Sequence, residues 1–492
     1  MHRVPSLAEL ESRIPNRSLN LDPELMREAG YRAIDWIVER QTRLRESSLG
    51  SEFTRKQTEA LLREPMPEDG QDLHQVIDAY ANKIAPLVVH VDHPMFFGFI
   101  PSSPTYVSML ADALVAGSNV FAGTWFESSG PSQVEILVID WFKEMLGLPA
   151  EAAGLLVSGG SVATLTALAV ARRAMLKNET EKAVVYLSDQ THASVDRALR
   201  LLNFHPHQLR RIPTDDDFRL DPAKLREEIA LDVRAGRRSF AVVANAGTTN
   251  TGAIDPLREI SAICREHRLW MHVDAAYGGF AALTERGRDL LTGIQHADSV
   301  VLDPHKWFYC GYEAGCVLVR QGNLMRETFE ILPEYTTDVA RESEEVNFCD
   351  YGVQLTRAFR ALKVWMTVKT FGARRLREII DQCLDLTQYA CALFGRSPRI
   401  EIASPPSLGI FSFRYIPKNV SDPDREEYLN RLNAALVARV IQSRRMVLSS
   451  TQLGPRLVIR FCVLNHRTRK EDIREALKLV EQFGDEAASH HH

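Results

Sequence analysis

The sequence lacks the features of a disulfide-bonded, zinc-binding or membrane-spanning protein. Its seven cysteines are an odd number and contain no CxxC pair, so they predict neither a disulfide framework nor a zinc knuckle. No uninterrupted apolar run reaches about 18 residues, the length of a membrane span, and the N-terminus has no apolar signal core. These absences predict a protein of the reducing cytoplasm with no metal site and no membrane partner.

The sequence also lacks an excess of either charge. A formal net charge of -5 and a pI near 6.3 give no bias toward polyanions, so nucleic acid is not an expected partner. With 492 residues, the chain is long enough for two or more packed regions and a deep site. The final three histidines look like part of a purification tag and are not interpreted as metal ligands.

Short apolar runs alternate with helix-length segments through the middle of the chain. The candidate strands are AVVYLS, SFAVVANA, LWMHVD, DSVVL and GCVLVR. This alternation predicts an α/β fold, in which helices cover both faces of a mostly parallel sheet. The expected parts are a helical N-terminal arm (1–85), a large domain (86–372), a small α+β domain (373–486) and a tail with the tag (487–492).

Two charged residues stand where candidate strands end, at the edge of a parallel sheet where ligands usually bind. Lys306 follows DSVVL in the stretch DPHKW, and Asp274 ends LWMHVD. A lysine beside a tryptophan usually lays its stem over the ring and keeps its ammonium in water. The alternative is a lysine kept partly neutral, so that it forms a Schiff base with a carbonyl. Asp274 needs a cationic partner, and the small Ala276 after it leaves room for a flat molecule.

Three further strand ends carry polar residues. Gly160 and Ser161 begin a helix, where free backbone amides suit a phosphate, although a serine there is more often a plain N-cap. His192 follows AVVYLS, in a position where a single histidine is more often structural. Thr249 and Asp255 follow SFAVVANA and offer a hydroxyl group and an acid.

These strand ends together call for a flat heterocycle that carries a phosphate and an aldehyde. The phosphate would lie at the helix start, a ring nitrogen would pair with Asp274, and the aldehyde would reach Lys306. That description fits pyridoxal 5′-phosphate (PLP). In order, the motifs VSGGSVAT, SDQTHASVDRA, AGTTNTGAID, HVDAAYGG and DPHKW resemble the group II pyridoxal-dependent decarboxylases, and among them the aromatic-L-amino-acid decarboxylases.

The resemblance covers most of the chain and implies a type I PLP-dependent enzyme fold. It also implies a homodimer with shared active sites, in which the N-terminal arm wraps around the partner subunit. Matched by position, Lys306 binds the cofactor covalently and Asp274 keeps the pyridinium nitrogen protonated. The other residues implied for the site are His192 on the ring, Gly160, Ser161, Thr249 and Ala276 around the cofactor, and His305 beside the substrate.

Asp303 departs from the family pattern, because many relatives have asparagine before PHK. An acid at this position is expected to change the charge around the phosphate or His305.

The segment FEILPEYTTDVARESEEVNF is rich in charge and lacks a steady period, which is typical of a loop. Its Tyr335 matches the loop tyrosine of the decarboxylases, where a group on a closing loop returns a proton to the substrate Cα. Considered alone, a loop tyrosine is more often surface packing.

The resemblance places Phe99, Pro101, Phe121 and Gly123 around the substrate side chain, partly from the neighbouring subunit. Phenylalanines favour an aromatic substrate, and Gly123 leaves space for an indole. Glu127 either accepts a hydrogen bond from an indole or phenol or faces solvent. The details look most like bacterial tryptophan decarboxylases, while tyrosine, phenylalanine and hydroxylated relatives remain open as substrates.

Three alternatives to a decarboxylase remain open. An aromatic aldehyde synthase would share the cofactor and the substrate. An aminotransferase would keep the carboxyl group and need an arginine to bind it. A catalytically silent PLP-binding protein is the alternative that is not an enzyme.

Overall fold

The structure is a computed structural model that describes residues 5–14, 18–50, 52–177, 179–331, 345–418 and 424–489. It divides into two compact units, Met1–Val89 and His90–His492. The described part of the first unit is helical, with α1 (Leu7–Arg13), α2 (Pro23–Thr42), α3 (Arg55–Leu62), α4 (Leu73–Ala79), η1 (Tyr80–Ile84) and η2 (Ala85–Leu87).

Helices of the first unit contact one another through polar and aromatic side chains. Asp22 caps the N-terminus of α2 by accepting hydrogen bonds from two backbone amides. Arg32 of α2 forms an ion pair of 2.5 Å with Asp78 of α4. Trp36 meets Tyr80 edge to face, with ring centroids 5.3 Å apart. These contacts hold α2 against the segment formed by α4 and η1.

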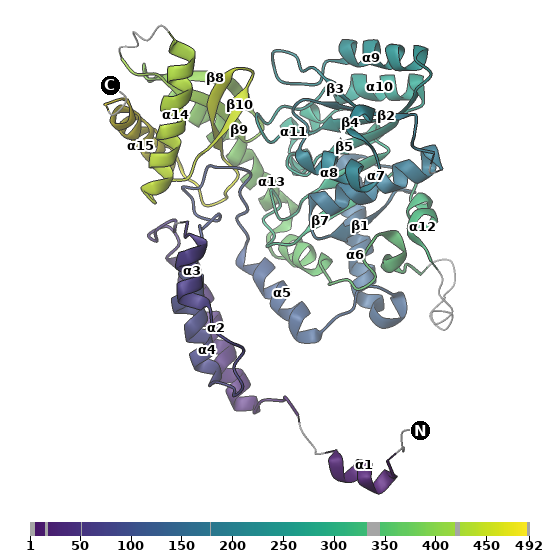
Figure 1. The fold of residues 1–492 in the computed structure, drawn as a ribbon, viewed down its shortest axis with the longest axis vertical. Helices are drawn as coiled ribbons and strands as arrows, with labels where there is room; N and C mark the ends of the chain where they lie inside the picture. Colours follow the sequence, from purple (N-terminus) through teal and green to yellow (C-terminus); the bar gives the residue numbers. More distant parts are fainter. Residues whose placement is uncertain are drawn as a thin grey trace. The chain divides into compact units, whose positions relative to one another are not determined.

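A seven-stranded sheet forms the centre of the second unit (Figure 1). Its strands are β1 (Ala153–Val157), β2 (Ala183–Ser188), β3 (Leu209–Ile212), β4 (Arg238–Asn245), β5 (Trp270–Asp274), β6 (Ser299–Leu302) and β7 (Gly315–Val319). The strand order is β1-β7-β6-β5-β4-β2-β3. β7 runs antiparallel to β1 and β6, and the other neighbours are parallel. The mostly parallel α/β sheet predicted from the sequence is confirmed.

All five runs predicted as strands are strands in the structure, namely β2, β4, β5, β6 and β7. Their continuous apolar and β-branched residues are buried, as expected for strands covered on both faces. Two strands of this sheet escaped prediction. β1 (AGLLV) is a short apolar run directly after a long helix, and β3 (LRRI) contains two arginines.

Helices of the second unit precede, connect and follow these strands. They are α5 (Tyr106–Ser118), α6 (Trp125–Leu146), α7 (Gly160–Leu176), α8 (Ala193–Leu201), α9 (Pro222–Arg234), α10 (Leu257–His267), α11 (Glu285–Leu290), α12 (Asn323–Phe329) and α13 (Ala361–Phe394), with 3-10 segments η3 (Pro206–Gln208), η4 (Gly279–Leu283), η5 (Ile294–His296) and η7 (Phe348–Tyr351). α7 packs against β1, β4, β5, β6 and β7, α9 packs against β3 and β4, and α10 packs against β4 and β5. This packing places the N-terminus of α7 at the end of β1.

A smaller antiparallel sheet follows α13, in agreement with the predicted α+β region. Its strands are β8 (Ile400–Ser407), β9 (Ile410–Tyr415), β10 (Ser449–Leu453) and β11 (Arg456–Cys462), in the order β10-β11-β9-β8. Helices α14 (Arg425–Gln442) and α15 (Lys470–Ser489) pack against it. Within α13, Gly372 has φ 72° and ψ 153°, so the helix bends at the residue where the sequence predicts the large domain to end.

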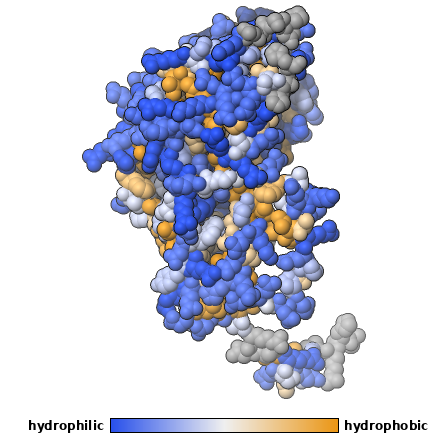
Figure 2. All heavy atoms as spheres, turned by 90° about the vertical axis from the view of Figure 1, so that its left-hand side faces the viewer, coloured by the Kyte–Doolittle hydropathy of each residue, from blue (hydrophilic) through white to orange (hydrophobic). Residues whose placement is uncertain are grey.

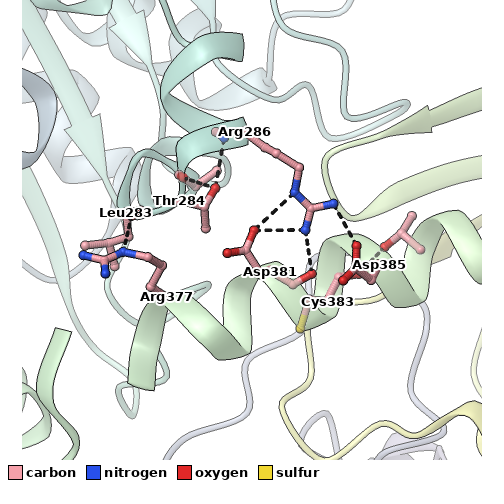
Figure 3. Close-up of polar contacts among 10 residues, drawn as sticks. Leu283, Thr284, Arg286, Arg377, Asp381, Cys383 and Asp385 are labelled. Atoms are coloured by element: carbon pink, nitrogen blue, oxygen red, sulfur yellow. Dashed lines mark hydrogen bonds and ion pairs between the residues drawn. The ribbon is translucent and has the colours of Figure 1, made fainter. Parts of the chain in front are cut away.

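The segment that follows β5 is fastened to α13 by an arginine network (Figure 3). Arg286 of α11 donates to Asp381 Oδ1 at 2.9 Å and to Asp385 Oδ1 at 2.8 Å. Arg377 of α13 donates in return to the backbone oxygen of Leu283 at 2.8 Å. The multidentate geometry fixes the direction of the chain between β5 and α11.

The surface in Figure 2 is mostly hydrophilic, with separate apolar patches. Exposed apolar side chains of the second unit include Phe99, Phe126, Tyr312, Val353 and Leu355. Within the described ranges, every helix is too short or too polar to cross a membrane.

Candidate active site

A cavity of about 360 Å³ lies where strands β1, β4, β5 and β6 end. This volume falls in the range of about 300–1,000 Å³ that is usual for small-molecule sites. The predicted site residues that line it are Gly160, Ser161, His192, Thr249, Asp274, Ala276, His305 and Lys306. The structure therefore brings together eight residues that the sequence predicted from separate strand ends.

Asp274 is the last residue of β5, and its backbone pairs in register with Asn245 at the end of β4. One carboxylate oxygen, Oδ1, accepts a hydrogen bond of 3.1 Å from the backbone amide of Ala276. This bond turns the chain sharply after the strand and leaves the carboxylate on the cavity wall. A carboxylate in that position binds a cationic ring nitrogen well.

Lys306 lies beside an acid. Its Nζ is 3.0 Å from Asp303 Oδ2, and the lysine side chain is only 24% exposed. Burial lowers the pKa of Lys306, but Asp303 and the more distant Asp274 raise it, and the pKa ends above its ordinary value. The sequence-based hypothesis of a partly neutral lysine is therefore wrong for this structure, because Asp303 stabilises the ammonium form.

His305 is fixed by the backbone. Its Nδ1 is 2.6 Å from the oxygen of Ala314, and its ring lies 5.0 Å from that of Tyr312. Burial lowers the pKa of His305, and Asp303 opposes this shift. The Ala314 amide also lies 3.3 Å from Nδ1, but the carbonyl oxygen is much closer, so in the neutral ring Nδ1 donates to that oxygen. Nε2 is then an acceptor that lies 3.7 Å from Asp303 Oδ2.

The N-terminus of α7 borders the same cavity. Gly159 precedes the helix without a side-chain cap, so the first backbone amides remain free for another acceptor. A Cβ atom on Gly160 would lie 2.8 Å from Asp303 Oδ2 and 3.3 Å from Ala276 Cβ, so any larger residue would have to displace the Asp303 carboxylate. The helix is 17 residues long, and its dipole favours an anion at this end.

His192 caps helix α8 with its ring. Nδ1 accepts a hydrogen bond of 3.2 Å from the backbone amide of Ser194 and lies 2.8 Å from the Ser194 hydroxyl. The neutral ring therefore carries its proton on Nε2. This capping role agrees with the structural interpretation of a single histidine, and it also holds the ring at the cavity wall.

The sequence missed Asn245, which lines the cavity and depends on Asp255. Asp255 is buried and accepts hydrogen bonds from the Asn245 backbone amide (2.7 Å), the Asn245 side chain (2.9 Å) and the Leu220 backbone amide (2.7 Å). Burial raises the pKa of Asp255 to about 6, against the effect of these bonds. Asp255 therefore positions the end of β4 and does not line the cavity. The strand-end rule could have identified Asn245, because it ends a predicted strand.

His272 lies two residues before Asp274 on β5 and is fully buried. Its Nδ1 is 2.9 Å from Ser299 Oγ, which accepts a hydrogen bond from Trp270 Nε1. Burial lowers the pKa of His272 to about 4, so the ring is neutral near pH 7.

We expect His272 to make the protein sensitive to acid. Because the folded-state pKa lies below the unfolded value of about 6.5, this stabilising contribution is complete above pH 6.5 and is lost as the pH falls toward 4. The loss amounts to about 3 kcal/mol. Thermal unfolding should be measured at pH 6.5 and at pH 4. His272→Gln should lose less stability between these two pH values than wild type does. The exposed His207→Gln is the control, and equal losses in all three proteins would contradict the prediction.

Four predicted residues do not line this cavity, and a fifth lies outside the described part of the chain. Phe99, Pro101, Phe121 and Gly123 are absent from its wall, and Phe99 is 63% exposed. Tyr335 lies outside the described residues. Residues 121–126 instead run beside residues 347–357, where Trp125 donates to Asn347 and Gly123 faces the Leu355 backbone.

Comparisons with known proteins cover nearly the whole chain. Residues 56–416 match the family model of the pyridoxal-dependent decarboxylase conserved domain. The chain is 40% identical to an aromatic-L-amino-acid decarboxylase of Bacillus atrophaeus, with 96% of this chain and 98% of the relative covered. It is 30% identical to a phenylacetaldehyde synthase of Arabidopsis thaliana, with 94% and 96% covered. The crystal structure of Oryza sativa TDC with PLP and tryptamine superposes with a TM-score of 0.90 at 27% identity, covering 96% of this chain and 99% of that one.

Proposed function

The chain belongs to the group II pyridoxal-dependent decarboxylases, in the aromatic-L-amino-acid decarboxylase family, and we propose how its residues release carbon dioxide from an aromatic amino acid. Its fold is that of the type I PLP-dependent decarboxylases, and its cofactor is PLP. The product is the arylalkylamine. The observation that carries the proposal is the cavity that joins Lys306, Asp274 and the N-terminus of α7.

The residues of the cavity fit PLP. Free amides at the start of α7 suit the phosphate, with Gly160 and Ser161 as its ligands. Asp274 offers a carboxylate to the ring nitrogen, and Ala276 adds little bulk beside it. Lys306 provides the amine that binds the aldehyde.

PLP, when bound, supplies the electron sink for breaking the bond between Cα and the carboxyl group. We assign Asp274 to hold a proton on the ring nitrogen, since a nearby anion raises the pKa of a cationic acid. His192, whose ring is held by Ser194, would stack on the cofactor ring, and Thr249, which lines the same cavity, would lie near the cofactor. We assign His305, whose ring is held by Ala314, to a position beside the substrate, where its Nε2 would be an acceptor.

The sequence alone assigns Tyr335 to return a proton to Cα. We expect Tyr335→Phe to retain PLP and substrate binding while lowering amine formation about 10²-fold or more, because a general acid is lost. The resemblance implies that aromatic aldehyde synthases carry phenylalanine at the matching position, so aldehyde, ammonia and peroxide should appear in air. Product ratios under air and nitrogen measure the change. Amine formation at the wild-type rate without oxygen consumption would contradict the role.

We propose that a homodimer completes the substrate pocket. The exposed Phe126, Val353 and Leu355 lie on the two neighbouring segments that also carry Phe121 and Gly123. Tyr312, 59% exposed, contacts the His305 ring at the edge of the cavity. Apolar side chains in such a position favour burial against a second copy of the chain.

The seven free cysteines fit the reducing cytoplasm expected from the sequence.

Gly123 provides a test of the pocket. A Cβ atom there would lie 2.4 Å from the Phe121 ring and 3.0 Å from the Leu355 oxygen, so Gly123→Ala must displace Phe121. We expect kcat/KM for tryptophan to fall about tenfold more than that for phenylalanine, because overpacking penalises the larger ring. Gly117→Ala is the matched control, since a Cβ atom there meets nothing within 4 Å. Equal losses for both substrates would remove Gly123 from the pocket.

The proposed function is tested by supplying the purified holoenzyme with a panel of amino acids and identifying the products by mass spectrometry. We expect amines from tryptophan, tyrosine, phenylalanine or their hydroxylated relatives, with tryptophan preferred, and none from glutamate. Glutamate turnover above that of every aromatic substrate would overturn the proposal. Keto acid as the main product would identify an aminotransferase instead.

A further inference from the structure

Asp303 is a buried acid in the place where the cofactor phosphate is proposed to bind. Its side chain is 2% exposed and borders the cavity. Its Oδ2 lies so close to the first residue of α7 that a Cβ atom on Gly160 would be 2.8 Å away. The N-terminus of α7 therefore already faces one carboxylate oxygen of the chain itself.

The carboxylate of Asp303 depends on a single close cation. Oδ2 is 3.0 Å from Lys306 Nζ, whereas the neutral His305 ring is 3.7 Å away. The other carboxylate oxygen, Oδ1, is buried and has no hydrogen-bond partner among the described residues. The titratable groups around Asp303 are Lys306, His305, Tyr312 and Cys316, with Asp274 beyond Lys306.

Cofactor binding would change the charges that surround Asp303. Lys306 would no longer offer a free ammonium group to Asp303 once its nitrogen bonds to the cofactor aldehyde, and any positive charge on that nitrogen would be shared with the cofactor. The phosphate brings up to two negative charges to the amides beside Asp303. Loss of the direct ammonium partner and gain of a nearby anion both favour the neutral form of a buried carboxyl group. A neutral carboxyl group also gains a donor, which an unpaired buried oxygen beside a phosphate can use.

We propose that Asp303 is ionised before PLP binds and becomes protonated in the holoenzyme, where it donates a hydrogen bond to the cofactor phosphate. This inference rests on the proposed position of the phosphate at α7. It explains how an acid can replace the neutral amide that many relatives carry before PHK. It also makes PLP affinity dependent on pH, because binding requires a proton that becomes scarce as the pH rises.

The test compares PLP binding to apoenzyme of wild type, Asp303→Asn and Asp303→Ala. Asparagine mimics the neutral acid in size and donor capacity, while alanine removes both charge and donor. Calorimetry in two buffers of different ionisation enthalpy counts the protons exchanged per cofactor. We expect wild type to take up about one proton more than Asp303→Asn. Relative to that variant, its Kd should rise up to about tenfold per pH unit above neutrality.

The outcomes separate the parts of the proposal. Equal proton counts and parallel pH curves for wild type and Asp303→Asn would overturn it. Asp303→Ala should match the proton count of Asp303→Asn but bind PLP more weakly, and equal affinity would remove the donated hydrogen bond. If wild-type apoenzyme binds no PLP at all, by heat or by absorbance, the proposed function itself fails.

Discussion

Lys306→Ala will lower decarboxylation by at least about three orders of magnitude and remove the visible absorbance of lysine-bound PLP. Lys306 is the only lysine on the cavity wall among the described residues. Its Nζ is held by Asp303 at 3.0 Å, so the amine has a fixed position beside the α7 N-terminus. Within the described ranges, no second amine lines the cavity to bind the aldehyde.

Lys306→Arg separates the covalent role from the charge. Arginine retains a cation beside Asp303 but cannot form the bond to the aldehyde. We expect this variant to be as inactive as Lys306→Ala while binding PLP without the lysine spectrum. Measurement requires steady-state rates and absorbance spectra of the three proteins. A visible lysine-type spectrum in either variant would show that another amine carries the cofactor.

Asp274→Ala should lower kcat by about 10²–10⁴-fold while leaving part of the PLP bound. The variant keeps the phosphate site at α7 but loses the anion that holds a proton on the ring nitrogen. The carboxylate is already oriented by the Ala276 amide at 3.1 Å, so its removal also frees that turn.

Asp274→Asn distinguishes charge from geometry, because the amide oxygen can still accept the Ala276 bond. We expect it to lose nearly as much activity as Asp274→Ala. Rates and the amount of PLP released by alkali should be measured together. Near wild-type turnover by Asp274→Asn at full cofactor occupancy would refute the role of the charge.

The sequence predicted most of the fold and the site because both follow local rules. Buried parallel strands are continuous apolar runs, so β2, β4, β5, β6 and β7 were recognisable. A parallel sheet collects the carboxyl ends of its strands at one edge, which is why Asp274 and Lys306 could be expected to meet.

The remainder depended on contacts in the folded chain that the pattern of residues does not reveal. The polar strand β10 (SSTQL) is specified by its pairing with β11 and not by its own pattern. The direction of the Lys306 pKa shift depends on a carboxylate 3.0 Å away, and the role of Asp255 depends on Asn245. Phe99 and Gly123 do not line the described cavity, although the sequence resemblance placed them beside the substrate.

The most direct test of the central claim is the stoichiometry of carbon dioxide and amine. Holoenzyme should be incubated with L-tryptophan labelled in the carboxyl carbon, and labelled carbon dioxide and tryptamine should be quantified over time. We predict equal amounts of labelled carbon dioxide and tryptamine at every time point, with no keto acid and no oxygen consumption. Retention of the label in a keto acid, or release of labelled carbon dioxide with aldehyde in place of tryptamine, would contradict the account.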